Sequence, residues 1–156
     1  MATNEKSMEV LNDLIEINND RVTGYEKAAE EAQKPDTDLQ AIFYSMANDS
    51  REYAAELTKE INKLGGNLAR GSTNKGEIYQ VWMDIKATFS GHDRQSVLES
   101  CEFGENAAQM AYTTAIASDA EIDARIKKII TNQKTFLKTA HNLVKTFSNA
   151  QQALNA

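Results

Sequence analysis

Apolar residues recur along this chain in steps of three and four, the spacing that places them on one face of an α-helix. The first stretch keeps this spacing without a slip from residue 8 to residue 32, which is more than three heptads. Three further stretches keep it over residues 39–64, 98–115 and 122–147. Glycine and proline supply only 8 of the 156 residues, whereas an all-β chain needs turn residues at short intervals. The sequence therefore predicts an all-α fold built from four long amphipathic helices.

The connections between the predicted helices indicate how they pack. Pro35 cannot continue a helix and ends the first, and Gly65-Gly66 supply a C-terminal stop for the second. Short links join the first helix to the second and the third to the fourth, so each of these pairs is predicted to form an antiparallel hairpin. A much longer link, residues 67–93, separates the second helix from the third. It can run the full length of the bundle and leave those two helices parallel, which is the ferritin-like connectivity with one long crossover.

The long link contains an amphipathic stretch of its own over residues 77–89, with Trp82 on its apolar side. We therefore expect a short extra helix in the crossover. No shift in composition marks a domain boundary, so we expect a single four-helix-bundle domain over residues 1–156. Residues 1–6 and 149–156 are polar and are expected to fray.

Charge and cysteine content narrow the class of protein. The net charge is -6 and the isoelectric point is about 5.0, which gives no electrostatic reason to bind nucleic acid or an anionic membrane. We see no secretory signal at the N-terminus and no apolar run approaching 18 residues. Cys101 is the only cysteine, so no disulfide can form within the chain. These features predict a cytoplasmic protein.

Each apolar seam is interrupted near its middle by one polar residue. Asn18, Ser50, Glu105 and Gln133 take these inward positions, one on each long helix. Buried polar groups cost free energy unless they are hydrogen-bonded, so the four residues are predicted to form one hydrogen-bonded layer, with Tyr53 beside Ser50. Because these neighbours are all neutral, burial would disfavour a charge on Glu105. We expect Glu105→Gln to be neutral or stabilising at pH 8.

Several short sequence segments are similar to those of a known protein family. They are residues 11–20, Gly24-Tyr25, Leu64-Gly65-Gly66, residues 82–86, and Gly104-Glu105 with Tyr112. On these runs the chain resembles a bacterial ferritin-like four-helix-bundle family of unknown function, over roughly residues 8–118 with a looser match in the fourth helix. The resemblance implies the fold but brings no established reaction or substrate.

The ferritin-like resemblance also gives the polar layer a meaning. Ferritin-like di-iron proteins place a single Glu on each of two helices and a Glu-x-x-His pair on each of the other two. The resemblance puts Asn18 and Glu105 at the single-Glu positions, and Ser50-x-x-Tyr53 and Gln133-x-x-Phe136 at the paired positions. Glu105 is then the only plausible metal ligand that is retained, because amides and hydroxyls are weak ligands for iron.

Two hypotheses about function follow. The first is a non-enzymatic structural, interaction or stress-related protein without a cofactor, in which the buried polar layer replaces a di-iron centre. The second is a metal-binding or oxidase-type protein whose degenerate site uses Glu105 to hold iron or another transition metal weakly. Under the first hypothesis we expect a homo-oligomer that binds no nucleic acid and no membrane, with any other protein partner unknown.

Self-association would need apolar side chains outside the core. Five apolar residues lie on helix faces away from the two-position seams. Some would broaden the core stripe, and any that remain exposed together would form a dimer patch. They are Leu14, Ile17, Phe43, Val97 and Ile130.

Overall fold

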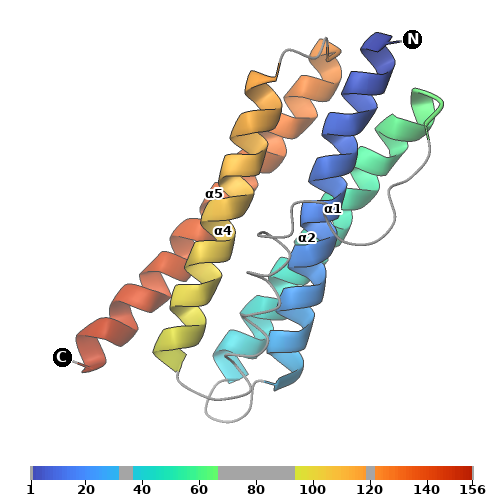
Figure 1. Ribbon diagram of the computed structural model, residues 1–156. Coiled ribbons are helices and arrows are strands. Elements are labelled where there is room, and N and C mark those ends of the chain that lie inside the picture. The colour runs from blue at the N-terminus through green and yellow to red at the C-terminus, as the bar shows by residue number, and fades with distance from the viewer. Residues whose placement is uncertain (1, 32–36, 67–93, 119–121, 156) are drawn as a thin grey trace.

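Four long helices account for nearly all of the described chain (Figure 1). The computed structural model describes residues 2–31, 37–66, 94–118 and 122–155. The helices are α1 (Ala2–Glu31), α2 (Thr37–Lys63), α4 (Arg94–Ala117) and α5 (Ala124–Asn155). The predicted all-α architecture is thus confirmed for these residues. Residues 2–6 and 149–155 continue α1 and α5, so fraying there stays a prediction, and the short helix expected at 77–89 lies outside the described residues.

The helices pack as two antiparallel hairpins, α1 with α2 and α4 with α5 (Figure 1). Contacts are dense within each hairpin, whereas between hairpins α1 meets α4 and α2 meets α5 more sparsely. The C-terminal end of α2 and the N-terminal end of α4 lie at opposite ends of the bundle, so α2 and α4 run parallel. This is the helix direction that the sequence predicts for a chain with one long crossover.

The end of α2 shows why two glycines follow it. The Gly66 N–H donates to the Ile61 carbonyl at 3.0 Å and the Gly65 N–H donates to the Asn62 carbonyl at 3.1 Å, which is the Schellman pattern. Gly65 takes the left-handed conformation that this pattern needs, with φ at 82°. Gly66 also lies close to α1, because a Cβ there would meet the Met8 sulfur, which would have to shift to make room. The predicted helix stop is therefore confirmed.

The apolar core is divided in two along the bundle axis. One cluster includes Tyr25, Phe43 and Leu98, and the other includes Leu11, Leu57 and Ile130. Buried polar side chains from the middle of the helices lie between these clusters. The division matches the interruption that the sequence shows in the middle of every seam.

One detail of the predicted core was wrong. Phe136 and Leu143 continue the seam of α5 by spacing, yet their exposed fractions are 61% and 41%. The reason is that α5 contacts α2 sparsely, so this edge of its apolar stripe is left uncovered. The five residues considered both for a broader core stripe and for a dimer patch are all buried, so they widen the core. They are Leu14, Ile17, Phe43, Val97 and Ile130.

Candidate functional site: a buried ion pair within a polar layer

The four inward polar residues predicted from the sequence are all buried in the middle of the bundle. Asn18 lies on α1, Ser50 on α2, Glu105 on α4 and Gln133 on α5, and none is more than 2% exposed. Because each comes from a different helix, the layer joins all four. Its chemistry depends on what else is buried at the same depth.

A fifth side chain, Arg21 on α1, changes the character of this layer. Its Nε donates to Oε1 of Glu105 at 2.7 Å and its Nη2 donates to Oε2 at 2.9 Å, so the guanidinium binds both carboxylate oxygens. Its Nη1 donates to the Ser50 hydroxyl oxygen. Arg21 and Glu105 are each 1% exposed. The expectation that Glu105 has only neutral neighbours was therefore wrong.

The environment of Arg21 keeps its guanidinium charged. Burial alone would lower the pKa of Arg21, but the charge of Glu105 and the hydrogen bonds to it raise that pKa above its ordinary value. The guanidinium carbon also lies 5.2 Å from the centre of the Tyr25 ring, within the range of a cation–π contact. The pair is thus a permanent cation beside a carboxylate, shielded from water.

From Arg21 a chain of hydrogen bonds crosses the whole bundle with its donors pointing in one direction. The Ser50 hydroxyl donates to Asn18 Oδ1 at 2.9 Å, and Asn18 Nδ2 donates to the Tyr112 hydroxyl at 2.7 Å. Tyr112 donates to Gln133 Oε1 at 2.7 Å. Gln133 Nε2 then donates to Glu56 Oε1 at 2.8 Å on the exposed side of α2. The chain therefore starts at a buried cation and ends at a surface carboxylate, an order in which each bond strengthens the next.

The phenol hydroxyls beside this chain stay protonated. Burial raises the pKa of Tyr112 above its ordinary value, even though the hydrogen bond from Asn18 opposes that change. Partial burial and the nearby Asp49 carboxylate raise the pKa of Tyr53 to about 12. Tyr112 therefore remains a donor at any physiological pH, and the direction of the chain is fixed.

Tyr53 and Phe136, the third residues after Ser50 and Gln133, lie outside this network. Tyr53 is only half-buried and joins the layer through its backbone carbonyl, which accepts from Gln133 Nε2 at 3.3 Å. Phe136 is exposed. The layer that the structure brings together is therefore Asn18, Ser50, Glu105 and Gln133 with Arg21 and Tyr112, while both of these aromatic rings lie on the α2–α5 side.

The sequence did contain a signal for Arg21. It lies seven residues after Leu14, four after Ile17 and four before Tyr25, all of them buried. A core-facing stripe of a globular helix is wider than a two-position seam, and this wider stripe includes position 21. A cation there and a single acid on a neighbouring seam could have been paired by charge.

The donors of the layer do not fit a di-iron or similar metal centre. Such a centre needs several carboxylates and imidazoles, whereas Glu105 is the only carboxylate inside the layer and Arg21 binds both of its oxygens. Within residues 2–31, 37–66, 94–118 and 122–155, no group of three or more His, Cys, Asp or Glu side chains is placed to hold a metal ion.

No described helix has the length and apolar character needed to cross a membrane.

Comparison with known proteins places the chain in a family. No curated protein matches it. The model of a protein family described as a domain of unknown function, DUF2383, matches residues 6–118. This stretch includes most of α1 and all of α2 and α4, and with them Arg21 and Glu105, but not α5. Since the match covers more than half of the chain, the protein belongs to the DUF2383 family.

Proposed function

We propose that this protein is a ferritin-like bundle with a non-enzymatic structural, interaction or stress-related role, in which an internal ion pair replaces the metal centre. The parallel arrangement of α2 and α4 supports a ferritin-like ancestry. So does the position of the polar layer, to which every helix contributes at least one inward side chain at mid-height. In a metal protein of this architecture the same positions supply the ligands.

One observation is the main support for this proposal: the Arg21 guanidinium donates hydrogen bonds to both carboxylate oxygens of Glu105. A di-iron site balances its carboxylates with metal cations. Here the protein supplies the cation from its own chain, and the hydrogen-bonded residues Ser50, Asn18 and Gln133 complete the layer. The layer has no free carboxylate oxygen pair to offer a metal. It does suit a role in fixing the register of the four helices.

The alternative is a degenerate metal or oxidase site that uses Glu105. For a metal to bind there, Arg21 would have to leave the carboxylate while remaining in the core. That would leave a buried guanidinium without its counter-charge, at a cost of about 3–5 kcal/mol. The alternative therefore predicts weak binding that competes with the ion pair.

Metal content decides between the two. Protein purified without chelator is analysed for iron, copper and manganese, alongside Glu105→Gln and the control Glu102→Gln, which alters a half-buried acid one turn earlier on α4. We expect all three proteins to carry the same low, substoichiometric metal. Near-stoichiometric metal that is lost only in Glu105→Gln would overturn the proposal.

We further propose that the interaction role includes self-association into a homo-oligomer. Large apolar side chains stay exposed on the described surface, among them Phe103 at 65% and Met110 at 64%. Sedimentation velocity over a hundredfold range of protein concentration tests this. A sedimentation coefficient that stays at the value of a 17 kDa monomer throughout would contradict it.

A further inference from the structure

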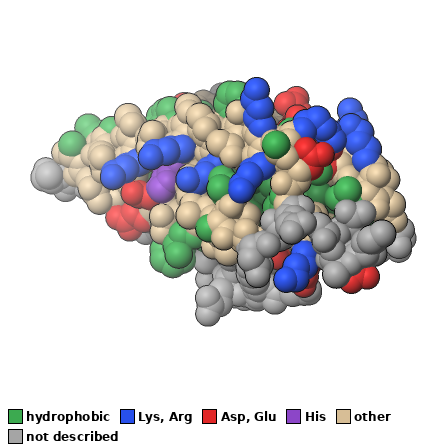
Figure 2. Space-filling model, turned by 90° about the horizontal axis from the view of Figure 1, so that it is seen from above, with side chains coloured by type: hydrophobic (Ala, Val, Ile, Leu, Met, Phe, Trp, Pro, Cys, Tyr) green, Lys and Arg blue, Asp and Glu red, His purple; other side chains and the backbone are tan. Residues whose placement is uncertain are grey.

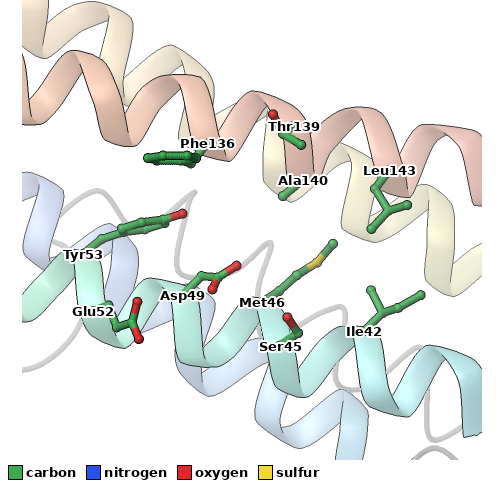
Figure 3. Close-up of a pocket in the computed structure, with 10 residues that line it drawn as sticks. All are labelled: Ile42, Ser45, Met46, Asp49, Glu52, Tyr53, Phe136, Thr139, Ala140 and Leu143. Atoms are coloured by element: carbon green, nitrogen blue, oxygen red, sulfur yellow. The ribbon is translucent and has the colours of Figure 1, made fainter.

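A groove opens between α2 and α5 where the two hairpins approach each other sparsely (Figure 3). Its volume is about 430 Å³. The rings of Tyr53 and Phe136 face each other across it, and Ile42 of α2 and Leu143 of α5 do so further along. At the far end of α2 an ion pair joins the two helices, with Arg125 Nη2 2.6 Å from Glu60 Oε1. Apolar side chains from both helices therefore form the walls of the groove.

The groove leaves apolar surface uncovered. Phe136 and Leu143 are 61% and 41% exposed, although their spacing belongs to the core stripe of α5. Exposed apolar side chains gathered around one concavity are typical of a binding surface. The apolar walls therefore favour an occupant with apolar side chains of its own.

The groove is also unbalanced in charge. Asp49 and Glu52 line it from α2, and among the described residues no cationic side chain lines it. Asp49 points into the gap between the helices (Figure 3). Burial raises the pKa of Asp49, and the neighbouring Glu52 adds to this effect while Arg21 opposes it. Cations from an occupant would relieve this repulsion, so the groove favours a partner that is both apolar and basic.

Such a surface exists elsewhere on the same chain. Helix α5 carries six Lys and Arg residues and no Asp or Glu, which leaves the rest of the chain at -12 given the net charge of -6. Lys127, Lys134, Lys138 and Lys145 are spaced at seven, four and seven residues, which places them on one helix face, hereafter the basic face. Lys145 lines a depression between α4 and α5, so this face lies on the α4 side and not on the groove side.

The basic face has apolar surface beside it. Phe103 of α4 lines the same depression as Lys145 and is 65% exposed. Two acids, Glu99 and Glu102, line the same depression as Lys145, so the part of the basic face that lies away from them is the stretch from Lys127 to Lys138. Figure 2 shows a face of the molecule where Lys and Arg side chains gather along its length.

We propose that the α2–α5 groove of one copy docks the basic face of a second copy, with Lys134 and Lys138 meeting Asp49 and Glu52. This inference rests on the proposed self-association and names the two surfaces that carry it. A second copy satisfies both demands of the groove at once, because it offers cations on α5 and the exposed Phe103 beside them.

The two surfaces lie on different sides of the chain, so the contact is heterologous. Each copy uses its groove toward one neighbour and its basic face toward another, and copies therefore add head to tail. A symmetric two-fold dimer through either surface alone would place like charges opposite each other, which is unfavourable. The arrangement predicts oligomers that grow with concentration.

Charge reversal separates the two surfaces. The groove variant is Asp49→Lys/Glu52→Lys, the basic-face variant is Lys134→Glu/Lys138→Glu, and Glu5→Lys/Glu9→Lys is a control with the same charge change as the groove variant on the exposed part of α1. Sedimentation velocity at low salt should show association of wild type and control. Each of the two surface variants should associate at least about tenfold more weakly, and 0.5 M salt should weaken the wild type. Circular dichroism melting curves check that every variant is folded.

A mixture of the groove variant and the basic-face variant gives the most specific test of the contact. The groove variant keeps an intact basic face and the basic-face variant keeps an intact groove, so an equimolar mixture should form a one-to-one dimer that grows no further. A chain with all four substitutions should associate with itself again. A wild type that stays monomeric would overturn both the self-association and this surface. A wild type that associates while both surface variants associate equally well, or a mixture that gives no dimer, would overturn the surface alone.

Discussion

Replacing Glu105 with glutamine removes one negative charge from the core while nearly preserving the shape of the side chain. From the sequence alone, with neutral neighbours around Glu105, this change is expected to be neutral or stabilising. The structure reverses that expectation, because Arg21 contacts both carboxylate oxygens and is itself 1% exposed. In Glu105→Gln the guanidinium stays charged but loses the carboxylate that balances it.

The size of the effect follows from the burial of both partners. Removing one member of a buried ion pair costs about 3–5 kcal/mol, because the remaining charge is left in a low-dielectric interior. The glutamine carbonyl can still accept one hydrogen bond from Arg21, so we expect a loss near 3 kcal/mol. A domain of this kind has a free energy of unfolding of about 5–15 kcal/mol, so this loss is a large fraction of its stability.

Urea unfolding at 25 °C and pH 7 measures the free energy of unfolding directly. The matched control is Glu102→Gln, which makes the same chemical change on a half-buried side chain of the same helix and should shift the value by less than about 0.5 kcal/mol. The double variant Arg21→Met/Glu105→Leu should recover much of the loss, because apolar residues can replace a buried pair without leaving a lone charge. A Glu105→Gln protein within about 1 kcal/mol of wild type would refute the reasoning.

Three further predictions concern other parts of the bundle. Tyr112→Phe removes a hydroxyl that both accepts and donates in the polar layer, so the free energy of unfolding should fall by about 1–3 kcal/mol in urea titrations. Phe136→Ala should change stability by less than about 0.5 kcal/mol because the ring is exposed, whereas Leu137→Ala at the adjacent buried position should cost about 2–5 kcal/mol; equal losses would contradict the exposed placement. The hydrogen bond from Arg125 holds the pKa of Glu60 below its usual 4.5, so Arg125→Ala should be less stable than wild type at neutral pH, and this difference should shrink as the pH falls below about 4.5. A difference that grows on acidification would show that the pair does not act in this way.

Much of the fold could be predicted because it depends on local signals. Steps of three and four identify the helices, Gly65 identifies the end of α2, and the lengths of the links give the helix directions. The inward position of Asn18, Ser50 and Gln133 follows from the same spacing. These features need no knowledge of which helix lies beside which.

The contents of the polar layer could not be predicted in the same way, because they depend on contacts between distant parts of the chain. Arg21 lies 84 residues from Glu105, and a two-position seam does not include it. Similarly, the exposure of Phe136 depends on how sparsely α2 and α5 meet, which periodicity within α5 does not report. The spacing of apolar residues identifies which face of a helix is buried. Which residues that face contacts depends on how the two hairpins pack together.

The division of the ion pair between the two hairpins constrains how the chain can fold. Before the hairpins meet, Arg21 on one and Glu105 on the other can each keep a shell of water. Docking has to remove water from both charges in a single step, since a slip of one helical turn, about 5.4 Å, would bury each charge away from its partner. Partly docked or misaligned arrangements of the two hairpins are therefore higher in free energy. Apolar contacts alone would allow several alignments of the hairpins along the bundle axis. We therefore expect the buried pair to make docking of the two hairpins cooperative and to favour one alignment between them.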